Sequence, residues 1–122
     1  MGFHEPHLDW RMPAAYLEHY PATDEIPLAH HRAAQRGRPP VSIHCPYQGA
    51  SFEKKWEGWG YVDPWTPMRN SSAQEMRRHY WAATSWMDHN VGRLLGALST
   101  AKQNASTIVV FHSVRWQQMH HS

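Results

Sequence analysis

Long hydrophobic runs are missing from this sequence of 122 residues. No uninterrupted aliphatic or aromatic run is longer than the one from Ile108 to Phe111. A transmembrane helix needs roughly 20 consecutive apolar residues, and the core of a secretory signal needs about 7 to 15. The sequence therefore predicts neither a membrane span nor a signal peptide.

Cysteine and charge are also scarce. The single cysteine, Cys45, excludes an internal disulfide framework and any zinc site built from cysteines. Twelve basic and ten acidic residues give a formal charge of +2, which is too little for a nucleic-acid-binding patch or a polybasic membrane anchor. Histidine, with 11 residues, and tryptophan, with 7, are abundant instead. This composition indicates a soluble globular chain and names no activity.

All nine prolines lie in the first 67 residues, where almost no periodic pattern is sustained. One short helix is expected from Pro13 to about Tyr20, because proline suits the first helical position and Pro21 follows the end. A run this long with so little regular structure is typical of a functional loop layer or of a segment that covers a scaffold.

A long amphipathic helix is the clearest element. Ser72 to Glu75 form a capping-box pattern, with Ser72 as N-cap and Glu75 returning the hydrogen bond. The apolar residues that follow recur every three or four positions, as on one face of a helix: Met76, Tyr80, Ala83, Met87, Val91, Leu94 and Leu98. Gly92 and Gly96 weaken this helix by about 1 kcal/mol each relative to alanine, and we expect them to allow another element to pack closely.

The segment Thr107 to His112 has the β-branched, unalternating pattern of a strand buried on both faces of a parallel sheet. A long helix, a short turn and such a strand make half of a βαβ unit, which predicts the α/β class. A parallel strand needs neighbours. Val41 to Ile43 is too short and too close to prolines to be one, so the receiving sheet is missing from this chain.

The first candidate site is the segment Gly2 to His7, which places His4, Glu5 and His7 around a proline. The residues alone allow a metal site, an anion contact or a polar surface turn. The pairs His30–His31 and His120–His121 are adjacent, unlike the i, i+4 spacing of helical metal ligands, and are expected to be solvated.

Two further patterns point to carbohydrate. Asn70 and Asn104 each begin an N-x-[ST] triplet, the acceptor pattern for N-glycosylation. The stretch from Trp56 to Tyr61 could stack on sugar rings or pack a loop layer onto a scaffold. No phosphate-binding glycine loop and no nucleophile elbow are present, and nothing supports a reactive thiol at Cys45.

Four stretches, in this order, resemble the sulfatases of the alkaline-phosphatase-like superfamily, and their iduronate-2-sulfatase branch most closely. Gly2 to Leu8 is similar to G-[FY]-H-K-P-H-[LI], and Ile26 to Ala29 matches a short hydrophobic segment. Tyr80 to Leu95 is similar to Y-x-A-x-x-S-[YW]-x-D-x-x-V-G-R-L-L. Asn104 to Ser113 resembles the glycosylated turn and strand that lead into the family's metal-binding S-D-H-G.

The resemblance implies a mostly parallel α/β sheet fold, of which this chain would be a central fragment with one long helix, one buried strand and long loops. It implies hydrolysis of sulfate esters on glycosaminoglycan-type sugars, with a formylglycine nucleophile and Ca²⁺, in a lysosomal or secreted enzyme. By position, His7 would contact the sulfate and His4 would support that loop. Asp88, Gly92 and Arg93 would belong to the helix that supports the sheet.

The chain departs from this family at three places. The formylglycine motif C-x-[PA]-x-R is absent, and Cys45-Pro46-Tyr47 does not match it. Val114 and Arg115 replace the Asp-His metal ligands, and Glu5 stands where the family has lysine.

These departures divide the chain into a partial catalytic domain over residues 1–113 and a divergent tail over 114–122. We expect the isolated chain to hydrolyse nothing and to bind no Ca²⁺ well, with no nucleic-acid or membrane partner. The alternative is a non-catalytic, His- and Trp-rich module that binds metal or glycan.

Overall fold

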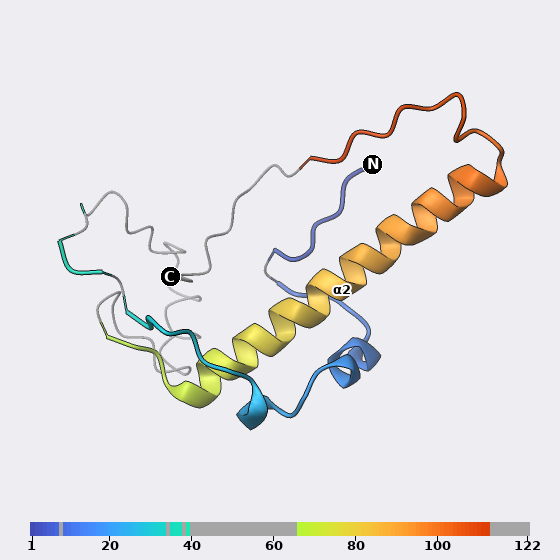
Figure 1. The fold of residues 1–122 in the computed structure, drawn as a ribbon. Coiled ribbons are helices and arrows are strands. Elements are labelled where there is room, and N and C mark those ends of the chain that lie inside the picture. Colours follow the sequence, from blue (N-terminus) through green and yellow to red (C-terminus); the bar gives the residue numbers. More distant parts are fainter. Residues whose placement is uncertain (8, 34, 38, 40–65, 113–122) are drawn as a thin grey trace. The chain divides into compact units, whose positions relative to one another are not determined.

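The computed structural model describes residues 1–7, 9–33, 35–37, 39 and 66–112 (Figure 1). Within these ranges it contains the 3₁₀ helices η1 (Ala14–His19) and η2 (Thr23–Glu25) and the α-helix α2 (Asn70–Thr100). The chain divides into two compact units. Of the described residues, one unit contains those from Met1 to Pro21 and from Arg78 to His112, and the other contains those from Ala22 to Arg77, so α2 contributes to both.

Helix α2 confirms the predicted long helix but begins earlier than expected. Its first residue is Asn70, and the Ala73 N–H donates to the Arg69 carbonyl over 3.0 Å. Ser72 therefore lies inside the first turn, where it is buried, and the prediction that it is the N-cap is wrong. Arg69, whose carbonyl accepts this first helical bond, occupies the N-cap position, although Asn70, Ser71 and Ser72 are the residue types that caps favour.

The C-terminal end of α2 is closed by a Schellman motif. Lys102 adopts a positive φ of 55°, its N–H donates to the Ser99 carbonyl over 2.9 Å, and the Gln103 N–H donates to the Leu98 carbonyl over 3.2 Å. These bonds satisfy carbonyls that would otherwise have no intrahelical partner. A lysine occupies the position that glycine usually takes, so composition alone does not reveal this end of the helix.

Burial changes along α2. Ala82 and Ala83 are fully buried, and the apolar stripe is buried or half-buried from Met76 to Val91. Beyond that point Leu94 and Leu95 are 42% and 44% exposed. A side chain built at Gly92 or Gly96 would meet open space, so the close packing expected at these glycines is not found around them.

The helix η1 lies where the sequence predicts a short helix, with Pro13 immediately before it. Within its unit, the Tyr20 hydroxyl hydrogen-bonds the Ser85 Oγ over 2.5 Å and donates to the Trp81 carbonyl over 3.1 Å. Arg78 Nη2 donates to the Leu17 carbonyl over 2.8 Å and reaches the Tyr20 carbonyl over 3.5 Å. Polar contacts to α2 thus hold the end of η1.

Among the described residues of the second unit, Ile26 is the buried apolar residue, with 1% of its surface exposed. The amide of Gln74, in the first turns of α2, donates to the carbonyls of Asp24 and Ile26 over 3.0 and 2.8 Å. Arg32 Nη2 also donates to the Met68 carbonyl. The short helix η2, which the sequence analysis does not predict, leads directly into Ile26.

The predicted buried strand is wrong for this chain. Residues 107–112 form no strand, and the apolar side chains Ile108 to Phe111 are between 57% and 91% exposed. Strand hydrogen bonds join neighbouring strands, and the part of the chain that the structure describes contains no strand at all. Val41 to Ile43 lie outside that part. The predicted long helix of the α/β fold is thus present, and the described residues contain no sheet.

Candidate functional site

The N-terminal turn brings His4 and His7 together. The His7 N–H donates to the His4 carbonyl over 3.1 Å, and the two imidazole ring centres lie 4.9 Å apart with their planes tilted by 50°. His4 is exposed and His7 is half-buried. The turn also contains Glu5 and a cis Glu5–Pro6 peptide bond. The structure therefore places both predicted substrate-side histidines in one small cluster.

Trp10 connects this turn to α2. Its Nε1–H donates to the Pro6 carbonyl over 2.9 Å, and its ring stacks on His79 with 6.1 Å between ring centres. The ring also meets Tyr80 edge to face at 6.5 Å. His79 is half-buried in this stack. The sequence does not identify Trp10 as a residue that supports this turn. The one feature that points to it is its position four residues after Pro6.

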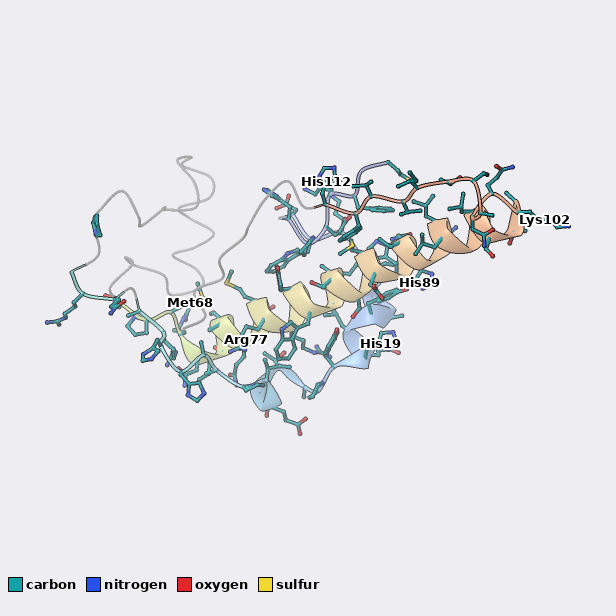
Figure 2. The ribbon with its side chains drawn as sticks, turned by 45° about the horizontal axis from the view of Figure 1, so that its top comes forward. His19, Met68, Arg77, His89, Lys102 and His112 are labelled. Atoms are coloured by element: carbon teal, nitrogen blue, oxygen red, sulfur yellow. The ribbon has the colours of Figure 1, made fainter. Side chains whose placement is uncertain are left out.

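A second aromatic cluster lies between η1 and α2, formed by Tyr16, His19, Trp86 and His89. The Tyr16 ring meets His19, Trp86 and His89 edge to face at 5.3, 5.2 and 6.0 Å, and Trp86 stacks on His89 at 5.7 Å. Figure 2 labels the two exposed members, His19 on η1 and His89 on α2. Edge-to-face and offset arrangements are the favoured geometries of aromatic pairs. This cluster holds η1 against the helix.

The two predicted glycosylation acceptors are exposed. Asn70 is the first residue of α2, and Asn104 lies in the turn that follows it. Asp88, Gly92 and Arg93 are exposed on α2, and His30 and His31 are exposed as expected. The remaining candidates lie outside the described residues: Cys45, Trp56 to Tyr61, Val114, Arg115, His120 and His121.

The donor atoms in the N-terminal turn do not suit calcium. Ca²⁺ takes six to eight oxygen ligands in proteins, whereas His4 and His7 offer nitrogen. Across residues 1–7, 9–33, 35–37, 39 and 66–112 no group of three or more His, Cys, Asp or Glu residues could hold a metal ion. Over the same ranges, no helix is both long and apolar enough to cross a membrane.

Comparison with known proteins confirms the resemblance to sulfatases. The chain is 31% identical to the iduronate 2-sulfatase of Homo sapiens over 113 residues, which is 93% of this chain and 20% of that protein. It is 27% identical to the iduronate 2-sulfatase of Mus musculus over the same length. The chain therefore spans about one fifth of the curated relatives it matches. No family model and no solved structure matches it.

Proposed function

We propose that this chain, as a segment related to the iduronate 2-sulfatases, is part of the catalytic domain of a sulfuric ester hydrolase over residues 1–113. The reaction is hydrolysis of sulfate esters on glycosaminoglycan-type sugars, in a lysosomal or secreted enzyme glycosylated at Asn70 and Asn104. The observation that carries this proposal is the match over 93% of the chain to iduronate 2-sulfatase. The complete enzyme would have the mostly parallel α/β sheet fold that this relationship implies.

Within this function His7 is the residue that contacts the sulfate. An imidazole N–H is a good donor to an anionic oxygen, and fixed donors around a transferring group stabilise the charge that develops on it. The 4.9 Å between the ring centres of His4 and His7 supports a role for His4 in holding the His7 ring. Glu5 works against anion binding unless another group neutralises it, since like charges repel.

Calcium belongs to the proposed complete enzyme rather than to the residues of this turn. A hard cation supplies charge stabilisation for the transferring group. The described residues contain no fitting donor set, and Val114 and Arg115 carry no carboxylate or imidazole. No catalytic step on this chain is therefore assigned to the ion.

The purified chain is expected to show no sulfatase turnover above the buffer rate, because it contains neither the C-x-[PA]-x-R motif nor the Asp-His ligand pair. The measurement is release of sulfate from an aryl sulfate and from a 2-sulfated uronate, with and without added Ca²⁺. Turnover that depends on calcium would contradict the expected inactivity.

Sulfate binding at the turn is tested separately on the same protein. Titration with sodium sulfate, against sodium chloride at equal ionic strength, is expected to shift the imidazole NMR signals of His7 more than those of His30 and His31. The variant H7Q should abolish the sulfate-specific part of the response. Equal shifts at all histidines would refute the assignment of His7 to the sulfate.

A further inference from the structure

We propose that His4 and His7 form a two-imidazole site for a first-row transition metal ion such as Zn²⁺, Ni²⁺ or Cu²⁺. Metal–nitrogen bonds to histidine are about 2.0 to 2.1 Å long, so two rings that share one ion place their centres roughly 4.5 to 5.2 Å apart. The observed separation of 4.9 Å falls inside this range. The separation of the two ring centres therefore meets the distance requirement for a shared ion.

The turn is held in place before any ion arrives. One hydrogen bond closes it between His7 and His4, and a second ties its Pro6 carbonyl to Trp10. Trp10 is in turn stacked on His79 of α2, within the same unit. A preorganised pair of ligands loses less conformational freedom on binding than a flexible pair does. This support distinguishes the turn from His30 and His31, which are neighbours in the chain and exposed.

The donor chemistry determines the class of ion. Imidazole suits zinc, copper and nickel, while calcium and magnesium prefer oxygen. No third His, Cys, Asp or Glu joins the pair among the described residues, so water or a small external ligand completes the coordination. Two protein ligands predict a modest affinity that follows the usual order, with copper binding more tightly than nickel or zinc.

The metal site rests on the geometry of the turn and is independent of the proposed sulfatase function. Sulfate binding and metal binding are measured in separate titrations of the full chain, and the metal titration contains no sulfate. A negative result in one titration therefore does not affect the interpretation of the other.

The experiment is a titration of the full chain with Cu²⁺, followed by the imidazole NMR signals, and with Zn²⁺, followed by calorimetry. Substoichiometric Cu²⁺ is expected to broaden the signals of His4 and His7 before those of any other histidine. The variant H4Q/H7Q should weaken the tightest Zn²⁺ step at least tenfold. The matched control H30Q/H31Q should leave that step unchanged.

The role of Trp10 provides a second, independent readout. Trp10→Phe keeps an aromatic ring against α2 but loses the Nε1–H that holds Pro6, so the Zn²⁺ affinity should fall severalfold while the far-ultraviolet circular dichroism stays the same. Single variants H4Q and H7Q, each weakening the same step, guard against misfolding of the double variant. Earlier broadening at other histidines, or a tight step that survives in H4Q/H7Q, would overturn the site.

Discussion

Replacing Ile26 by alanine is expected to lower the free energy of unfolding of its unit by about 2 kcal/mol, at the lower end of the range for buried isoleucine. Ile26 is 1% exposed and follows η2, where the Gln74 amide bonds its carbonyl. The lower end applies because the described residues include few buried apolar side chains, so the cavity can relax partly.

Hydrogen exchange measures this effect locally. The amides of Glu25 and Ile26, which bond the carbonyls of Ala22 and Thr23, should exchange roughly 30-fold faster in I26A, as about 2 kcal/mol implies. The matched control is Ile108→Ala, which removes the same atoms at a position 91% exposed and should change stability by less than about 0.5 kcal/mol. Equal effects at the two positions would show that Ile26 does not form a core.

Enlarging Ala83 to leucine is expected to destabilise the other unit by about 1 to 3 kcal/mol. Ala83 is fully buried, as is the neighbouring Ala82, so α2 is covered over a broad sector at this level. The added carbon atoms must displace a neighbour or force an unfavourable rotamer.

Urea unfolding followed at 222 nm, together with exchange at the Tyr20 amide, tests this substitution. Ala97→Leu is the control, since Ala97 is exposed on the same helix and leucine has nearly the helix propensity of alanine. The control should change the free energy of unfolding by less than about 0.5 kcal/mol. An unchanged free energy of unfolding in A83L would mean that the residues packed over Ala83 rearrange to accommodate the larger side chain.

The sequence predicts the long helix well because its signal is local and repeated. Apolar residues from Met76 to Val91 recur at helical spacing, and the structure buries or half-buries them. The start of the helix is less predictable, because Arg69 takes the N-cap position although three better cap residues follow it. The segment Thr107 to His112 shows the opposite case. Its β-branched pattern predicts a strand only where neighbouring strands can pair with it. The described residues contain no such strand.

The candidate site was predictable only in its local part. His4 and His7 lie three positions apart around a proline, and such spacing alone suggests a turn. The support from Trp10 and His79 joins residues far apart in the chain, so no local pattern indicates it. The same applies to the cluster of Tyr16 and Trp86. Long-range ring contacts arise from how segments dock, which a single sequence does not encode in its spacing.

The uncovered last turns of α2 have a consequence for how the molecule comes apart. From Gly92 onward, Leu94 and Leu95 are exposed, Leu98 is half-buried, and a Cβ built at Gly92 or Gly96 would meet nothing within 4 Å. Helix–coil cooperativity then governs this stretch, much as in an isolated peptide. It should unzip from Thr100 inward at temperatures where the segment around Ala83 is still folded, so melting of this one helix proceeds in two stages.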